Sequence, residues 1–176
     1  MHLGLLYSKD GLRNCIGYSE ADWAGDIDDG KSMLGYLFQM TGAAISWRSK
    51  KQMCAALSTA EAEYMALACA ALEAIWMRQL LPDLRNNPTV ATQIVKDNKS
   101  AICLAKNLQF DGRAKHIGIK YHFIQEQVEK GNVELQYCPT EEKFADMLTK
   151  GLSWNRFMKL RMMCGIEEMI RHYPWE

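Results

Sequence analysis

Carboxylate side chains stand at the ends of several expected strands and at the start of one expected helix. Carboxylates in such places can converge when the strands and the helix belong to one sheet. Mg²⁺ prefers hard oxygen ligands, and pairs of ions about 4 Å apart suit phosphoryl chemistry. The pattern therefore indicates a divalent-metal site, whereas each side chain alone would be taken for a solvated surface group. The residues concerned are Glu20, Asp22, Glu61, Glu63, Asp97 and Asp146.

The segment 25–32 matches the phosphate-binding pattern G-x-x-x-x-G-K-[ST]. That loop directs backbone N–H groups and a lysine at phosphates from a turn that leads into a helix. Here Asp26, Asp28 and Asp29 would lie against the phosphates, and the residues that follow are typical of a strand. The sequence therefore predicts a solvated acidic turn at this place.

His116 and His122 are candidate metal ligands by residue type. Six residues turn a helix by roughly 240° beyond one full rotation, so the two imidazoles do not share a face as ligands at i and i+4 do. A structural or substrate-contacting role is favoured for both.

The elements that must position the carboxylates follow from periodicity and turn residues. Three strands in a row precede a long helix, which opens at the capping box formed by Ser58 and Glu61 and stops before Pro82. Strands and helices then alternate, which predicts a mixed α/β sheet with an antiparallel meander and covering helices. The expected strands are 13–22, 34–40, 43–47, 92–96 and 133–137, and the expected helices are 59–81, 100–106, 117–130 and 141–150, with an amphipathic helix in the tail 154–176.

Composition places the chain among globular proteins. It has 176 residues, of which 48% are hydrophobic and 24% charged, so one domain with a modest extension is expected. The net charge is zero, so any nucleic-acid binding must use local basic patches. The six cysteines form no C-x-x-C pair and are expected to be reduced, mostly core thiols. Neither a membrane span nor a secretory signal is found, which favours the cytoplasm or the nucleus.

An ordered series of motifs resembles the ribonuclease H domain of copia-type LTR retrotransposon Pol polyproteins. The resemblance runs from about residue 3 to residue 166, in the same order and spacing. The motifs are YSEADWAG at 18–25, KS at 31–32 with GY at 35–36, SWRSKKQ at 46–52, LSTAEAEYMA at 57–66, DNKSA at 97–101, KHI at 115–117, YCPTE at 137–141 and ADMLTK at 145–150.

This resemblance implies a ribonuclease H-like fold, with a five-stranded mixed sheet flanked by helices and Glu20 on its central strand. It divides the chain into a remnant of the connection after reverse transcriptase (1–12), a ribonuclease H-like domain (13–152) and a C-terminal helical tail (153–176). The implied activity is two-metal-ion hydrolysis of the RNA strand of RNA/DNA hybrids. The implied partners are the hybrid and the reverse transcriptase domain of the same polyprotein.

Four residues correspond to the catalytic, metal-binding carboxylates of the family: Glu20, Glu63, Asp97 and Asp146. They would bind two Mg²⁺ ions, for which Mn²⁺ could substitute. We expect this cluster, without metal, to raise the pKa of at least one member through like-charge repulsion. Glu20 departs from the family, which has aspartate there, and is expected to impair activity. Asp22, two residues on, would share the face of Glu20 and could assist it.

Basic residues are expected to contact the phosphates of the hybrid, which supplies affinity that is independent of sequence. Two alternatives stay open: a catalytically inactive hybrid-binding or domesticated module of the same fold, and a carboxylate nuclease that acts on DNA, such as an integrase or a junction resolvase. The residues expected to bind substrate are Arg48, Lys50, Lys51, Lys99, Lys115 and His116.

Overall fold

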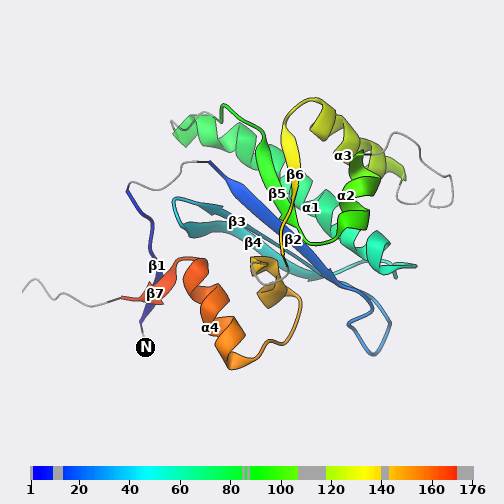
Figure 1. Cartoon of the computed structure of the whole chain (residues 1–176), viewed down its shortest axis with the longest axis horizontal. Coiled ribbons are helices and arrows are strands. Elements are labelled where there is room, and N and C mark those ends of the chain that lie inside the picture. The colour runs from blue at the N-terminus through cyan, green and yellow to red at the C-terminus, as the bar shows by residue number, and fades with distance from the viewer. Residues whose placement is uncertain are drawn as a thin grey trace, which may run out of the picture.

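A computed structural model describes residues 2–9, 14–84, 86, 88–106, 118–139 and 143–169 of the chain (Figure 1). Its centre is a five-stranded sheet in the order β4-β3-β2-β5-β6, in which β2, β3 and β4 are antiparallel and β2, β5 and β6 are parallel. The expected mixed sheet, with Glu20 on the central strand, is confirmed. The strands are β2 (Ile16–Asp22), β3 (Met33–Met40), β4 (Ala43–Lys51), β5 (Thr92–Lys96) and β6 (Val133–Tyr137).

Helices cover the two faces of the sheet unequally. The long helix α1 crosses one face together with α2 and α3, while a short 3-10 helix, η4, and helix α4 lie on the other (Figure 1). In the described part of the chain, no helix has the length and apolar character needed to cross a membrane. The helices are α1 (Thr59–Leu80), the 3-10 turn η1 (Leu81–Leu84), α2 (Lys99–Lys106), α3 (Gly118–Glu129), η4 (Phe144–Leu148) and α4 (Trp154–Met163).

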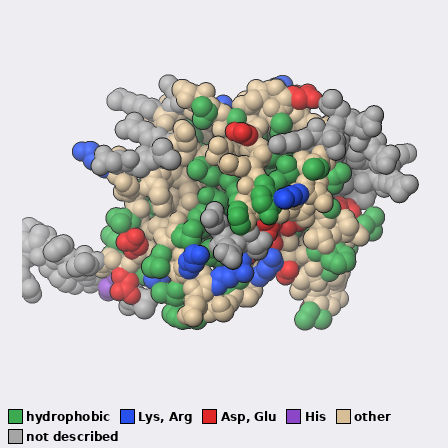
Figure 2. Space-filling view, viewed as in Figure 1, with side chains coloured by type: hydrophobic (Ala, Val, Ile, Leu, Met, Phe, Trp, Pro, Cys, Tyr) green, Lys and Arg blue, Asp and Glu red, His purple; other side chains and the backbone are tan. Residues whose placement is uncertain are grey.

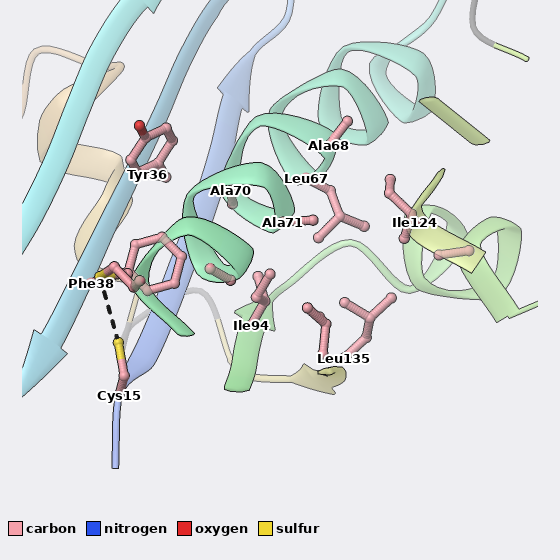
Figure 3. Close-up of a cluster of buried hydrophobic side chains, with 14 of the residues drawn as sticks. Cys15, Tyr36, Phe38, Leu67, Ala68, Ala70, Ala71, Ile94, Ile124 and Leu135 are labelled. Atoms are coloured by element: carbon pink, nitrogen blue, oxygen red, sulfur yellow. Dashed lines mark hydrogen bonds between the residues drawn. The ribbon is translucent and has the colours of Figure 1, made fainter. Parts of the chain in front are cut away.

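Alternation along β3 divides the core between the two faces. Phe38 packs with Leu67 of α1 and Ile94 of β5 on the α1 side (Figure 3). Leu37 points to the opposite face, where it packs in a smaller cluster with Phe144 of η4. Alanines dominate the face of α1 that meets the sheet, so the helix can lie close to β2 and β3. The 22-residue helix therefore holds its first two turns against the edge where β2 ends.

Local signals in the sequence are largely confirmed. Ser58 accepts a hydrogen bond from the Glu61 N–H at 3.2 Å, while the Glu61 carboxylate accepts from the Leu57 N–H, one residue before the position that a capping box prescribes. Thr41 and Gly42 form the expected hairpin turn, both with positive φ. The acidic segment 26–29 is a turn that leads into β3, as expected.

Two expectations need correction. Where a helix was expected at 141–150, the described part is a 3-10 helix of five residues, whose Phe144, Ala145 and Asp146 are all buried. The tail contains helix α4 but then turns into strand β7 (Ile166–Glu168), which pairs antiparallel with β1 (Leu3–Leu5). Residues 170–176 and 140–142 lie outside the described residues.

Gly35 lies opposite Glu20 in the β2–β3 ladder and allows η4 to approach the sheet. A Cβ at Gly35 would lie 2.8 Å from Leu148 Cβ and 2.9 Å from Thr149 Cγ2. We expect Gly35→Ala to lower the free energy of unfolding by about 1–3 kcal/mol through overpacking. Urea denaturation measures the change, with Gly118→Ala as control because, among the described residues, no atom beyond its chain neighbours and its own helix backbone would lie within 4 Å of a Cβ there. Equal stability of Gly35→Ala and the unmodified chain would contradict this packing.

All six cysteines are free, but only Cys15, Cys138 and Cys164 are buried, so fewer are core thiols than expected. Burial raises the pKa of the Cys15 and Cys164 thiols from 9.0 to about 12. In the unfolded chain these thiols ionise near pH 9, so the unfolded state loses protons there while the folded state keeps them.

Stability should therefore fall as the pH rises from 9 towards 12, by at most about 1.4 kcal/mol per pH unit for each thiol. Urea unfolding of the unmodified chain and of Cys164→Ala at pH 8, 9 and 10 measures the slope, which the substitution should reduce. Cys54→Ala is the control, because that thiol is exposed. The account is wrong if the Cys164→Ala slope equals that of the unmodified chain.

Candidate metal centre

Three of the four expected carboxylates meet at one edge of the sheet. Glu20, Glu63 and Asp97 can each offer one oxygen such that all three oxygens lie within 4.8 Å of one another. Glu20 and Glu63 are buried and Asp97 is half-buried. They line an open cleft of about 440 Å³. The donor set suits a hard divalent cation, which takes carboxylate oxygens.

The fold explains this convergence. Because β2 and β5 are parallel neighbours, residues near their carboxyl ends share one edge of the sheet, where Glu20 and Asp97 lie. Glu63 reaches the same edge from the second turn of α1. Its Oε2 accepts a hydrogen bond from the Ala21 N–H at 3.1 Å, which fastens the start of the helix to β2.

Asp146 approaches the centre through a lysine. It is buried on η4, with 1% of its surface exposed, and is outside the group of three carboxylates that lie within 4.8 Å. Lys150 joins it to Glu20, with Nζ 2.7 Å from Glu20 Oε1 and 3.6 Å from Asp146 Oδ1. Asp22 lines the same cleft but is also outside that group. The structure thus brings three predicted carboxylates together and attaches the fourth to them indirectly.

Two buried lysines in the centre were not expected from the sequence. Lys143 is 1% exposed, and its Nζ contacts Glu20 Oε2 and Asp97 Oδ1 and lies 3.8 Å from Glu63 Oε1. Lys96 is fully buried, and its Nζ contacts Glu63 Oε2 and lies 3.5 Å from Ser19 Oγ.

Lys96 could have been found, because period-2 alternation in β5 places it on the same face as the buried Ile94. No comparable pattern marks Lys143.

The carboxylates and the cations of the centre are equal in number. Glu20, Glu63, Asp97 and Asp146 are matched by Lys96, Lys143, Lys150 and Arg156, whose Nη2 contacts Asp146 Oδ2. Side chains of this chain therefore already offer a cationic partner to each carboxylate that would hold divalent ions.

Burial is the largest cause of the pKa shifts of Glu63, Lys96 and Lys143. Burial raises the pKa of Glu63, and Asp97 adds to the increase while Lys96 opposes it. The expected rise in at least one pKa is thus found, but its main cause is desolvation and the like charge contributes less. Burial likewise lowers the pKa of Lys96, against the attraction of Glu63. Burial lowers the pKa of Lys143 to about 7, and Asp146 opposes that shift.

The basic residues expected to bind substrate are spread over the surface. Arg48, Lys50 and Lys51 lie on the exposed half of β4, where Lys51 pairs with Asp26. The Lys99 ammonium lies 4.7 Å from the centroid of the Tyr137 ring. Figure 2 shows lysine and arginine side chains gathered over η4 and α4, beside carboxylates. Lys115 and His116 lie outside the described residues, and His122 is exposed on α3.

The sheet order, the covering helices and the carboxylates at one edge together define a ribonuclease H-like domain. Among solved structures, LC11-RNase H1, isolated from compost, superposes with a TM-score of 0.59 at 18% identity, covering 78% of this chain and 94% of that one. The same protein in complex with an RNA/DNA hybrid gives a TM-score of 0.55 at 15% identity, covering 77% and 94%. At these identities the likeness concerns the fold alone.

Sequence relatives identify the particular family. The chain is 43% identical over 150 residues to the retrovirus-related Pol polyprotein from transposon TNT 1-94 of Nicotiana tabacum, covering 85% of this chain. It is 39% identical over 163 residues, or 93% of the chain, to that from transposon RE1 of Arabidopsis thaliana. It spans 11% of the length of each of these curated relatives. No family model matches the chain. The chain corresponds to a region of copia-type retrotransposon Pol polyproteins, and that region has a ribonuclease H-like structure.

Proposed function

We propose that this chain is a ribonuclease H-type endonuclease that hydrolyses the RNA strand of RNA/DNA hybrids as part of a retrotransposon polyprotein. The observation that carries the proposal is the convergence of Glu20, Glu63 and Asp97 in an open cleft of a ribonuclease H-like fold. The similarity to a ribonuclease H solved with an RNA/DNA hybrid supports the choice of substrate.

Glu20, Glu63 and Asp97 would hold the divalent ions, with Asp146 completing the set from η4. When bound, two Mg²⁺ or Mn²⁺ ions would activate water and stabilise the leaving oxygen of the scissile phosphate. The fixed hydrogen bond from the Ala21 N–H holds the Glu63 carboxylate in one orientation, so this ligand needs little rearrangement. The open cleft leaves the carboxylates accessible to a phosphate of the substrate.

Substrate affinity would come from basic side chains outside the centre. Arg48, Lys50 and Lys99 are exposed and would contact phosphates, a contact that carries no sequence information. Preference for RNA would come from contacts to 2′-OH groups in the minor groove. The same polyprotein would supply a reverse transcriptase domain as partner, with segment 1–12 as its connection, 13–152 as the nuclease domain and 153–176 as an added tail.

A hydrolysis assay tests the proposal. The chain is incubated with an end-labelled RNA/DNA hybrid, double-stranded RNA and double-stranded DNA, each with Mg²⁺, Mn²⁺ or EDTA. We expect weak cleavage of the RNA strand of the hybrid, stronger with Mn²⁺ and absent with EDTA. Cleavage of duplex DNA instead would support the DNA-acting alternative. No cleavage of any substrate in either metal would remove the nuclease assignment.

The charge balance of the centre favours a second function, a catalytically inactive module that binds hybrid. Each of the four carboxylates already has a cationic side chain as partner, so the folded chain holds these groups in contacts that need no metal ion. Hybrid binding without hydrolysis, measured by fluorescence anisotropy in EDTA and in Mn²⁺, distinguishes this function from the first.

A further inference from the structure

We propose that the Lys143 ammonium group is an internal counterion in the place of one divalent ion, so that a metal ion enters only when the Lys143 side chain leaves the carboxylates. The proposal rests on the proposed function, because it treats Glu20, Glu63 and Asp97 as metal ligands. It adds a residue of this chain that controls access to them.

Position and burial single out Lys143. Within the described residues it is the one cation that lies within 4.0 Å of all three carboxylates. Its Nζ contacts one oxygen each of Glu20 and Asp97, so the oxygens that a metal would use are already engaged by a positive charge. The side chain is 1% exposed although it lines the open cleft, so in this state its charge is directed at the carboxylates and not at solvent.

The other cations hold different places. Lys96 approaches Glu63 from the buried side and contacts Oε2, whereas Lys143 faces Oε1. Lys150 contacts the second oxygen of Glu20 from the rim, where 37% of its side chain is exposed. Lys143 is therefore the cation that lies between the three carboxylates, whereas Lys96 pairs with Glu63 and Lys150 pairs with Glu20.

Physical chemistry makes the occupation mutually exclusive. An ammonium group and a divalent cation would compete for the same oxygens and repel each other at a few Å. An ammonium group is also costly to bury without its counterions. Metal binding must therefore displace Lys143 towards the cleft opening. The backbone can retain its place meanwhile, because the Lys143 carbonyl accepts a hydrogen bond from the Asp146 N–H at 3.3 Å, at the start of η4.

Calorimetric titration with Mn²⁺ tests the proposal. Lys143→Met keeps the length and removes the charge, and we expect it to bind Mn²⁺ at least about tenfold more tightly than the unmodified chain. Lys130→Met is the matched control, because that lysine pairs with Glu126 on the exposed surface of the molecule. Equal Mn²⁺ affinity of Lys143→Met and the unmodified chain would overturn the proposal. Lys143→Gln repeats the test with a polar side chain.

A measurement on the unmodified chain needs no substitution. Acetic anhydride labelling, read by mass spectrometry, should leave Lys143 protected relative to Lys130 in EDTA, and saturation with Mn²⁺ should remove the protection. Persisting protection at saturation would count against displacement. The outcomes also separate the two proposals. Tighter Mn²⁺ binding by Lys143→Met, without hydrolysis by any variant, supports the inference and removes the nuclease function. Hydrolysis of the hybrid, with equal Mn²⁺ affinity of Lys143→Met and the unmodified chain, supports the nuclease function and overturns the inference.

Discussion

Glu63→Gln is expected to abolish hydrolysis of the hybrid and to lower the free energy of unfolding by about 3–5 kcal/mol, because it removes the partner of a buried ammonium group. Both the Ala21 N–H and the Lys96 ammonium donate to Glu63 Oε2. A glutamine carbonyl oxygen can take that position, but the amide NH₂ would then replace Oε1, which faces Lys143 at 3.8 Å. The glutamine NH₂ and the Lys143 ammonium, both hydrogen-bond donors, would then face each other where a carboxylate oxygen now faces the ammonium.

The double variant Glu63→Gln/Lys96→Met separates structure from catalysis. Methionine fills the volume of Lys96 without its charge, so most of the lost stability should return while hydrolysis stays absent. Urea denaturation and initial rates on the hybrid measure the two effects. Glu126→Gln is the control, since its pair with Lys130 is exposed and such pairs contribute about 0–1 kcal/mol. If Glu63→Gln cleaves as fast as the unmodified chain, the nuclease assignment fails; if the double variant is no more stable than the single one, the ion-pair account fails.

Glu20→Asp is expected to raise the rate of hydrolysis with Mg²⁺ by about 10 to 10³-fold. Glutamate carries one methylene more than aspartate, which shifts its carboxylate by roughly 1 Å when the backbone is fixed. Mg²⁺ requires near-ideal octahedral geometry, and a displacement on the order of 1 Å can cost about 10²-fold in rate. In this chain the long side chain also reaches Lys143, the cation proposed to compete with metal, so shortening it loosens that contact.

Initial rates with Mg²⁺ and with Mn²⁺ measure this prediction. Replacing Mg²⁺ by Mn²⁺ should raise the rate of hydrolysis of the unmodified chain more than that of Glu20→Asp, because Mn²⁺ tolerates a wider range of ligand geometries than Mg²⁺. Hybrid affinity should change little, since basic residues make the phosphate contacts. Asp22→Asn is the control, a carboxylate that lines the same cleft outside the group of three. Equal rates for Glu20→Asp and the unmodified chain would show that the longer side chain is no obstacle.

The sheet could be predicted because its determinants are local. Alternating strands, the turn at Thr41 and Gly42 and the capped, alanine-rich helix each carry their signal within a few residues. The resemblance to the ribonuclease H family then implies the arrangement of the strands in the sheet, and the parallel pairing of β2 with β5 brings Glu20 and Asp97 to one edge. The convergence of three carboxylates followed from that topology, together with the resemblance that assigned Glu63 rather than Glu61.

What could not be predicted depends on contacts between distant segments. The strands β1 and β7 have three residues each and exist only by pairing with each other across the whole chain. The segment around Asp146 forms a short 3-10 helix that packs against β2 and β3, strands more than 100 residues earlier in the chain. Lys96 and Lys143 contradict the rule that lysine stays in solvent. Only the assembled carboxylates make those positions favourable for an ammonium group.

The ladder between β1 and β7 has a mechanical consequence. Leu3 pairs with Glu168 and Leu5 with Ile166, and the Met169 N–H donates to the His2 carbonyl at 2.8 Å, so both outer ends leave the ladder on the same side. Tension applied through these ends loads the hydrogen bonds one after another, as in a zipper, and not all at once as in shear. At the junction of α4 and the main sheet, the Ala44 N–H donates a hydrogen bond to the Cys164 carbonyl. The load reaches this junction only after the ladder has opened. The short ladder thus acts as a release that yields under traction before the sheet carrying the carboxylates is strained.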